Sequence, residues 1–386
     1  MTEMVYGPAP ARPGEPIIPH WWRTVDRWSI AAIFALFLCG LLLGMAASAP
    51  LAVRNGLDPF YYVNRQAFFG AVALGTMLVV SMLTPTTLRR LSVLAFAGAV
   101  LAVAFLPVLG TDFGKGAVRW YSLGFISVQP SEFLKPAFAV VAAWLMAASY
   151  DAGGPPGRLL SFATAAILAA MLALQPDFGQ AGLIVATWAL MYFAAGAPLV
   201  LLLSVGGGVL GAGWFAYHNS QHVARRIDGF LASEVDPRTQ IGYATNAIQE
   251  GGFLGVGPGN GQVKWILPDA HTDFIIAVAA EEFGLILCVA IMALYATVVV
   301  RSLLRLVRVR DPFVRLAGTG LAALLGMQAM INMGVAVRLL PAKGMTLPLV
   351  SYGGSSLIAA GLGLGVLLAM TRSRPQHDID DILGTR

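Results

Sequence analysis

Acidic side chains at the start of one apolar stretch are the first candidates for chemistry in this sequence. Asp273 precedes Glu281 and Glu282, and a helix that begins at Asp273 places it on one face with Ala277 and Glu281, at i, i+4 and i+8. Glu281 then lies about 12 Å deeper than Asp273, at about 1.5 Å per residue. Carboxylates buried at that depth are expensive and need a polar cavity or a basic partner. The spacing indicates an acidic centre, with the cap of a helix as the alternative role of Asp273.

A second cluster combines cations with one carboxylate. Arg119 lies in a Lys-Gly-Ala-Val-Arg-Trp-Tyr segment, and Glu132 and Lys135 follow in Gln-Pro-Ser-Glu-Phe-Leu-Lys. In one interpretation Arg119 and Lys135 face a diphosphate, and Glu132 holds one of them in place. In the other, Ser131 caps a helix, Glu132 lies at its positive end, and Lys135 and Trp120 anchor the segment at a membrane surface. Both interpretations remain open at this stage.

Two further turns carry polar groups between apolar runs. Asp177, in Gln-Pro-Asp-Phe-Gly, either caps the next helix or lines a cavity at membrane depth. The segment 340–356 contains Lys343 and the hydroxyls of Ser351 and Ser355. Small residues there permit close helix packing, and a hydroxyl-rich pocket wall is the competing interpretation.

The long segment 217–273 carries Arg225, Arg226 and a glycine-rich run over 251–261, followed by Lys264. The run lacks the Gly-Lys-Ser/Thr ending of a phosphate-binding P-loop, and no strand precedes it as a dinucleotide fingerprint requires. We expect a compact loop whose backbone approaches a ligand closely.

The elements that position these groups must be membrane helices. The chain has 386 residues, of which 57% are hydrophobic and only 12% charged, about half the charge of a soluble domain. The net charge of +5 is concentrated in loops, which indicates topology and anionic lipid rather than nucleic acid. Cys39 and Cys288 lie inside apolar runs, so neither a disulfide framework nor a zinc site is expected.

A spanning helix needs about 20 apolar residues, and the sequence predicts an all-α protein with about ten spans. Positive charge at 301–315, at Arg23 and Arg27, and at Arg89 and Arg90 after the second span predicts that both termini are cytoplasmic. The expected organisation is a tail over 1–27, a membrane domain over 28–371 with a large extracytoplasmic loop over 217–273, and a tail over 372–386. The uncharged runs are 28–53, 66–88, 91–111, 136–150, 159–176, 178–224 divided at 196–198, 283–300, 316–337 and 344–371.

These motifs together resemble the SEDS family of cell-wall glycosyltransferases, the group that contains RodA, FtsW and SpoVE. The resemblance runs from about residue 25 to 372. Residues 332–334 and 341–348 resemble the cell-division branch of the family more than the elongation branch. The chain departs from many relatives at Ala244, where glutamine is common, and at Asp269, where glutamate is common. The motifs that carry the resemblance are Arg119-Trp120, Gln129–Lys135, Gln175–Gly179, His271–Phe274 with Glu281-Glu282, and Ser351–Ser356.

The resemblance implies polymerisation of lipid II, the undecaprenyl-pyrophosphate-linked disaccharide peptide, into β-1,4 glycan during cell division. The family's essential aspartate matches Asp273, which would be the general base of one inverting displacement. Cationic residues would bind the diphosphate, with Mg²⁺ or Mn²⁺ as an expected cofactor whose protein ligands are unknown. The expected substrate-binding residues are Arg119, Glu132, Lys135, Arg226, Lys343, Ser351 and Ser355, with Asp177, Glu281 and Glu282 as supporting acids.

The resemblance also implies a partner and a place in the cell. The expected partners are lipid II, the bilayer, a class B penicillin-binding transpeptidase similar to FtsI, and other division proteins. The expected location is the bacterial cytoplasmic (inner) membrane at the division septum. Two alternatives remain: a flippase that moves lipid II across the bilayer, and a scaffold of the division machinery without chemistry. Polar residues concentrated on one side rather than at the midplane disfavour the transporter.

Overall fold

The computed structural model describes residues 16–114, 117–219, 221–231, 239–341 and 344–373. Helices make up nearly all the regular structure in these ranges. In chain order the elements are α1 (Ile17–Thr24), α2 (Arg27–Arg54), α3 (Tyr61–Met82), α4 (Pro85–Leu109), β1 (Tyr121–Ser122), β2 (Ser127–Val128), α5 (Pro130–Ala148), α6 (Gly157–Leu174), α7 (Phe178–Ala194), α8 (Leu199–Asn219), α9 (Gln221–Leu231), α10 (Gln240–Gly251), the 3-10 turn η1 (Val263–Trp265), α11 (Ile275–Leu306), α12 (Pro312–Ala336) and α13 (Gly354–Met370).

Helices lie in the places of the ten predicted spans. Among the described residues, α2, α3, α4, α5, α6, α11 and α12 are long and apolar enough to cross a membrane. The apolar helices α7 and α13 are shorter, and α8 follows α7 after the turn at 196–198. Backbone groups in lipid must bond within their own segment, which is why apolar stretches of this length become helices. The chain is a polytopic, all-α membrane protein.

Several boundaries differ from the sequence prediction. Helix α3 ends at Met82, and Thr84 caps α4 by accepting a hydrogen bond from the backbone N–H of Thr87. Arg89 and Arg90 therefore lie within α4. The prediction that they lie in a loop was wrong. The ends of the predicted domains stay predictions, since residues 1–15 and 374–386 lie outside the described ranges.

Helix α11 begins before the uncharged run at 283–300 but two residues after Asp273, and it is broken. It starts at Ile275, and Gly284 has φ 74° and ψ −175°, which divides the helix into a short and a long part. Glycine is the residue that adopts such a conformation without steric cost. The break leaves backbone groups that another segment must satisfy.

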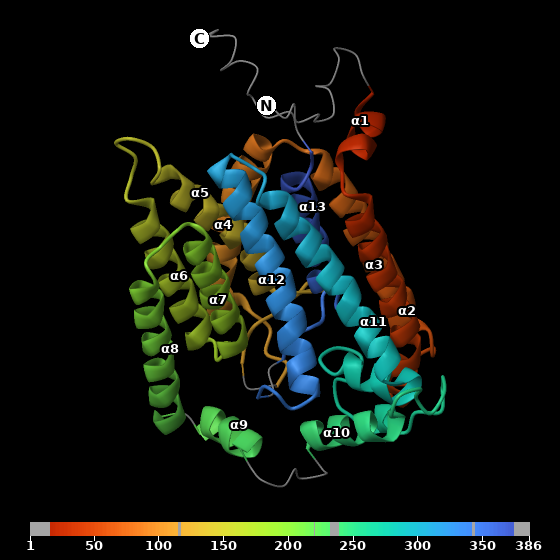
Figure 1. Cartoon of the computed structure of the whole chain (residues 1–386). Helices are drawn as coiled ribbons and strands as arrows, with labels where there is room; N and C mark the ends of the chain where they lie inside the picture. Colours follow the sequence, from red (N-terminus) through yellow and green to blue (C-terminus); the bar gives the residue numbers. More distant parts are fainter. Residues whose placement is uncertain (1–15, 115–116, 220, 232–238, 342–343, 374–386) are drawn as a thin grey trace.

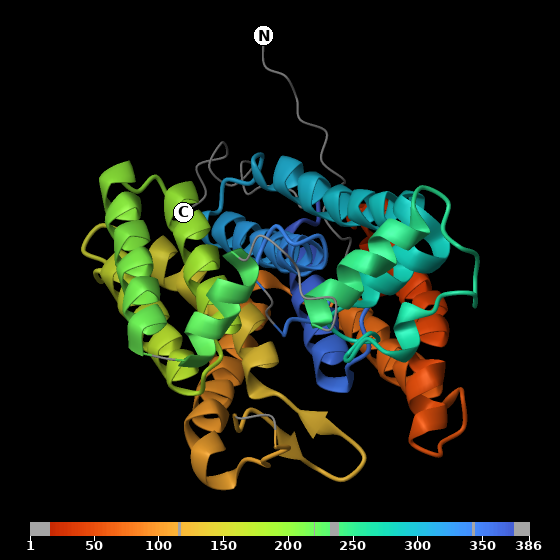
Figure 2. The same cartoon turned by 90° about the horizontal axis from the view of Figure 1, so that it is seen from below.

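The helices form one bundle with its two ends clearly different (Figure 1). Helix α13 packs on α3, α11 packs on α2 and α12, and α5 packs on α4 and α12. The most buried of these seven spans are α5 and α12: within an apolar stretch of 18 residues, 72% and 61% of their residues are buried, against 17% for α4. Figure 2 shows α12 and α13 between the group α4–α8 and the group α2, α3 and α11. Polar side chains on α5 and α12 thus lie at the centre of the molecule.

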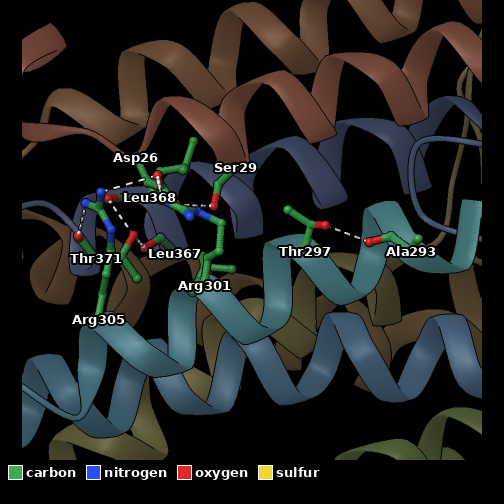
Figure 3. A network of polar contacts seen from close by, with 9 residues as sticks. All are labelled: Asp26, Ser29, Ala293, Thr297, Arg301, Arg305, Leu367, Leu368 and Thr371. Carbon is green, nitrogen blue, oxygen red and sulfur yellow. Dashed lines mark hydrogen bonds and ion pairs between the residues drawn. The ribbon is translucent and has the colours of Figure 1, made fainter. Parts of the chain in front are cut away.

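Polar contacts close the bundle at the end where α1 lies (Figure 3). The buried carboxylate of Asp26 accepts hydrogen bonds from Arg301, at 2.7 and 2.8 Å, and from Arg305, at 3.2 Å. Arg305 also donates to the backbone oxygen of Thr371, at 3.2 Å. These bonds join the start of α2 and the ends of α11 and α13. The opposite end of the bundle carries α9, α10 and the loops that hold the predicted site (Figures 1 and 2).

Candidate active site

Asp273 lies in the turn before α11, and the structure does not make it a helix cap. The cap position is Phe274, and the backbone N–H of Asp273 donates to the oxygen of Asp269 at 3.1 Å. The Asp273 side chain is half-buried. Its carboxylate lies beside Gly344, because a Cβ added to that glycine would be 3.3 Å from Oδ2. The loop before α13 therefore passes directly over the carboxylate.

Glu281 does not continue a line of carboxylates from Asp273, because α11 does not extend back to residue 273. Its side chain is buried, and Oε1 accepts hydrogen bonds from the backbone N–H groups of Gln262, at 2.5 Å, and Val263, at 2.8 Å. Glu281 is thus bound to the loop that precedes η1. The prediction of one acidic face over 273–281 was wrong.

Glu282 has the basic partner that its burial required. Its Oε1 lies 2.5 Å from Nζ of Lys264, and Oε2 accepts from the backbone N–H of Gly259 at 3.0 Å. Both charged side chains are almost fully buried. This ion pair fixes the loop on α11 rather than presenting a charge to a ligand.

The glycine-rich run packs on the break in α11. The backbone N–H groups of Val256 and Gly257 donate to the oxygens of Glu281 and Glu282, at 2.9 and 3.1 Å. Leu285, just after the break, donates its N–H to the oxygen of Gly252 at 3.0 Å. The loop therefore supplies the partners that the broken helix lost. The sequence predicted that the backbone of this loop approaches a ligand closely. In the structure the loop backbone approaches α11.

A buried polar network lies where α5, α7 and α12 meet. Lys135 Nζ is 2.9 Å from Oε2 of Glu132 and 3.4 Å from Oε1 of Gln328. The second carboxylate oxygen of Glu132 accepts from Gln180 at 2.9 Å. The side chain of Lys135 is only 2% exposed. Glu132 does hold a cation, as one interpretation required, but that cation is used inside the protein.

A small cavity adjoins this network, with a volume of about 40 Å³. Its polar lining comes from Glu132, Lys135, Gln328, Thr346 and Ser356, and the rest is apolar. That volume has room for ordered water and not for a sugar. The cavity therefore supports the network rather than a substrate.

Arg119 and Asp177 meet at the turn between α6 and α7. The Arg119 guanidinium donates to the backbone oxygens of Gln175, at 3.2 Å, and Pro176, at 2.5 Å. Asp177 stands at the cap position of α7 but makes no side-chain capping bond. Burial raises the pKa of Asp177 above its usual 3.8, and the charge of Arg119 opposes that rise. The structure thus places Arg119, Asp177, Glu132 and Lys135 in one electrostatic cluster.

The two serines are occupied by backbone contacts. Ser351 donates its hydroxyl to the oxygen of Thr272 and accepts from the N–H of Leu347 at 2.9 Å. Ser355 accepts from the N–H of Gln129 at 3.3 Å, and each serine is 1% exposed. In this arrangement they join segments of the protein. A substrate-binding role for either stays a prediction.

The structure does not describe the side chains of two expected cations. Lys343 lies outside the described residues, directly before Gly344 in the sequence, and the side chain of Arg226 in α9 is also outside them. The sequence interpretation missed Gln328 and Asn332, which bind the loop before α13 from one face of α12. Their signal was two amides at i and i+4 in an uncharged apolar run.

An aromatic groove lies at the same end of the bundle, next to the start of α3. It has a volume of about 450 Å³ and is open to the surface. Arg65 forms part of its wall, donates to the oxygen of Phe125 in the β1–β2 turn, and lies near Tyr61. Its lining residues are Asp58, Tyr61, Asn64, Arg65, Phe68, Phe69 and Phe125.

A ring contact links the start of α3 to the acidic segment. Tyr62 lies 5.7 Å from the ring of His271 and 5.4 Å from that of Tyr352. His271 and Tyr352 are themselves 5.6 Å apart. Three distant parts of the chain thus form an aromatic cluster, and its member His271 lies two residues before Asp273 in the sequence.

Among the described residues, no three His, Cys, Asp or Glu side chains come close enough together to hold an ion. A cage made by those residues alone therefore does not fit Mg²⁺ or Mn²⁺.

The fold and the site define a class: a multi-pass membrane protein whose chemistry-bearing loops gather at one end of the helix bundle. A family model described as "Cell cycle protein", for FtsW, RodA and SpoVE, matches residues 27–376. The chain belongs to this family.

Relatives within the family share most of its length. The chain is 41% identical over 366 residues to a probable peptidoglycan glycosyltransferase FtsW of Caulobacter vibrioides (strain NA1000 / CB15N), covering 95% of this chain and 94% of that one. It is 35% identical over 358 residues to a probable peptidoglycan glycosyltransferase FtsW of Halorhodospira halophila (strain DSM 244 / SL1), covering 90% of each chain.

Two solved structures share the fold. A chain of a peptidoglycan synthase complex, described as coordinating polymerization and crosslinking, has a TM-score of 0.74 at 27% identity, covering 90% of this chain and 97% of that one. The rod shape determining protein RodA of Thermus thermophilus has a TM-score of 0.65 at 27% identity, covering 92% of this chain and 99% of that one.

Proposed function

We propose that this chain is a peptidoglycan glycosyltransferase that polymerises lipid II into β-1,4 glycan strands, with Asp273 as general base. The observation that carries the proposal is the setting of Asp273. Its carboxylate is half-buried under the Gly344 loop, at the bundle end that also holds the aromatic groove. The family membership and the FtsW relatives support the same reaction.

The proposed reaction is one inverting displacement. The acceptor's sugar hydroxyl attacks the anomeric carbon of the donor, the bond to undecaprenyl pyrophosphate breaks, and Asp273 takes the hydroxyl proton. An inverting transfer needs one base and no carboxylate nucleophile. The two buried glutamates fit this scheme, because their contacts with the glycine-rich loop assign them to holding the fold.

Arg119 is the described cation best placed for the leaving diphosphate, because its guanidinium is partly exposed while it donates to the turn at 175–176. Lys343 and Arg226 are proposed as further diphosphate ligands on the resemblance alone. Lys135 is proposed to act through the buried network and not by contact, because its ammonium is paired with Glu132 and its side chain is only 2% exposed. The aromatic groove beside Arg65 is proposed to hold the isoprenoid chain of the substrate.

A divalent cation is proposed to bind with the substrate rather than in a protein cage. Mg²⁺ commonly uses one or two carboxylates together with substrate phosphates. In this protein it would neutralise charge on the leaving diphosphate. The proton transfer to Asp273 does not depend on this cation.

The proposed cellular setting is the division septum of the bacterial cytoplasmic (inner) membrane, with both termini in the cytoplasm. We also propose a class B penicillin-binding transpeptidase as partner, on the likeness to a chain of a peptidoglycan synthase complex. The identity with FtsW proteins favours division over elongation.

The test is polymerisation of lipid II by the purified full chain, alone and together with its transpeptidase, in the presence of Mg²⁺ or Mn²⁺. We expect glycan polymer from the native chain and none from Asp273→Asn. The matched control is Asp311→Asn, which makes the same chemical change at the cap of α12, where asparagine caps equally well. If Asp273→Asn made polymer at the native rate, Asp273 would not be the general base. Translocation of lipid II by the native chain without polymer would favour a transporter.

A further inference from the structure

Three successive backbone carbonyls of the segment that ends in Asp273 are each held by a hydrogen bond. The oxygen of His271 accepts from the N–H of Tyr352 at 3.0 Å, and that of Thr272 accepts from the Ser351 hydroxyl. The oxygen of Asp273 accepts from Nδ2 of Asn332 at 2.9 Å. All three donors belong to α12 or to the segment that leads into α13.

Asn332 bridges two segments with one amide. Its Nδ2 also donates to the oxygen of Met345 at 2.6 Å, and the side chain is only 3% exposed. Both hydrogens of the amide are thereby directed at carbonyls on either side of it. The same group fixes Asp273 and the loop whose Gly344 lies beside the Asp273 carboxylate.

Ser351 acts in the same way one residue earlier. Its hydroxyl donates to the oxygen of Thr272 and accepts from the N–H of Leu347 at 2.9 Å. The side chain is 1% exposed, so water does not compete for either bond. Segment 271–273 and segment 345–351 are therefore held as one unit by two buried side chains.

A general base works only within hydrogen-bond reach of the proton that it takes, and a displacement of about 1 Å can cost about a hundredfold in rate. Asp273 lies outside the regular part of α11, so the helix does not fix its backbone. We infer that Asn332 and Ser351 are positioning residues, which hold the Asp273 backbone in register with the 344–351 segment during the reaction. This inference rests on the proposed function, because it gives Asp273 the role of base.

The variants separate the effect of losing the hydrogen bond from the effect of changing the side-chain volume. Asn332→Leu and Asn332→Asp both keep much of the shape and remove the amide donor. Ser351→Thr and Ser351→Val add nearly the same bulk, and only threonine keeps a hydroxyl. The controls are Thr319→Val, elsewhere on α12, and Ser302→Ala, at the far end of α11 and as buried as Ser351.

Two measurements are made on the purified full chain with its transpeptidase. The first is the steady-state rate of lipid II polymerisation. We expect Asn332→Leu and Ser351→Val to lose about a hundredfold in kcat with KM within about threefold of native, because a positioning residue acts on the transition state and not on binding. Ser351→Thr should recover most of the loss relative to Ser351→Val, and both controls should keep the native rate.

The second measurement is hydrogen exchange, which does not depend on activity. Asn332→Leu should speed exchange in peptides over 269–274 and 345–352 and leave peptides of α6 unchanged, because α6 packs on α4, α5 and α7. Native exchange in those peptides would overturn the inference, and so would faster exchange with native kcat or an effect on KM alone. A native chain that makes no polymer would overturn the proposed function instead, and faster exchange would then show a purely structural clamp.

Discussion

At the scale of single residues, Glu132 and Lys135, two of the predicted substrate-binding residues, form a buried ion pair. Both side chains are nearly fully buried and lie 2.9 Å apart. A cation already paired in this way is poorly suited to meet a diphosphate. Removing one member of such a pair leaves an uncompensated charge, whereas replacing both by apolar groups is often tolerated.

Glu132→Ala should therefore lower the free energy of unfolding by about 3–5 kcal/mol, since it leaves the Lys135 ammonium buried alone. The double variant Glu132→Gln, Lys135→Met should lose much less. Thermal unfolding in detergent measures both. A double variant as unstable as Glu132→Ala would contradict the pairing, and a stable double variant without polymerase activity would give the pair a part in the reaction.

Asp177 offers a pH test at the same scale. Burial raises the pKa of its carboxyl in the folded chain, so the folded state keeps a proton that the unfolded state releases near pH 3.8. Stability contributed by this group is therefore lost as the pH rises from about 4 through the folded pKa. Asp177→Asn should remove this loss and be at least as stable as the native chain at neutral pH.

The measurement is the midpoint of thermal unfolding between pH 4 and 8 for the native chain and Asp177→Asn. Asp311→Asn serves as the control, because that carboxylate caps α12 at the other end of the bundle. Parallel pH curves for the native chain and Asp177→Asn would show that Asp177 is not desolvated.

At the scale of elements, α11 and the glycine-rich loop form one unit. The loop donates to carbonyls of Glu281 and Glu282 and accepts from Leu285 across the break at Gly284. Glycines are needed where the two backbones touch. A Cβ on Gly251 would lie 1.9 Å from the oxygen of Ala280, which no rotation of a side chain relieves.

Gly251→Ala should accordingly destabilise the protein by forcing the loop off α11, in the range of about 1–3 kcal/mol that overpacking costs. Gly98→Ala in α4 is the control, because a Cβ there meets nothing within 4 Å and alanine favours a helix by about 0.5–1 kcal/mol. Thermal unfolding compares the two. Equal stability of both variants would show that the loop does not pack as described.

At the scale of the whole molecule, the two ends of the bundle differ. We call the end with α9, α10 and Asp273 the chemical end, and the end where Asp26 contacts Arg301 and Arg305 the closing end. Asp26 at the closing end is buried, which would raise its pKa, but hydrogen bonds from Arg301 and Ser29 and the charge of Arg305 outweigh burial and lower it. Its stabilising contribution is thus present above about pH 4 and is lost as the pH falls through the lowered pKa. The contacts link segments at opposite ends of the sequence.

Asp26→Asn should cost on the order of 2 kcal/mol at neutral pH, since it removes charge-assisted hydrogen bonds from two arginines that are themselves about a third exposed. The deficit relative to the native chain should shrink as the pH is lowered below about 4. Thermal unfolding against pH measures it, and a deficit that is constant with pH would contradict an ionised Asp26.

The sidedness of the bundle is testable in cells. With Cys39 and Cys288 replaced by alanine, a cysteine at Leu254, 77% exposed at the chemical end, should react with an impermeant thiol reagent outside the cytoplasmic membrane. A cysteine at Val307, 78% exposed at the closing end, should react only after lysis. The reverse pattern would invert the proposed topology and place the candidate active site in the cytoplasm.

Sequence alone determined the helices, because an apolar segment in lipid must satisfy its backbone hydrogen bonds within itself, and a helix does so. Ten charge-free apolar stretches predicted the places of α2 to α8 and α11 to α13, and the polar motifs between them predicted which loops carry polar groups. Errors arose at helix ends and at Gly284, where one glycine breaks α11 and nothing in the run of apolar residues signals it.

The tertiary structure decided which polar groups meet. Glu282 bonds to Lys264, 18 residues earlier, and Asn332 bonds to the backbone of Asp273, 59 residues away. A charge or amide in a buried position must find a partner, but many partners along the chain satisfy that demand equally well in sequence terms. Only the packing of α11 on α12 and of the glycine-rich loop on α11 brings one of them within hydrogen-bond distance.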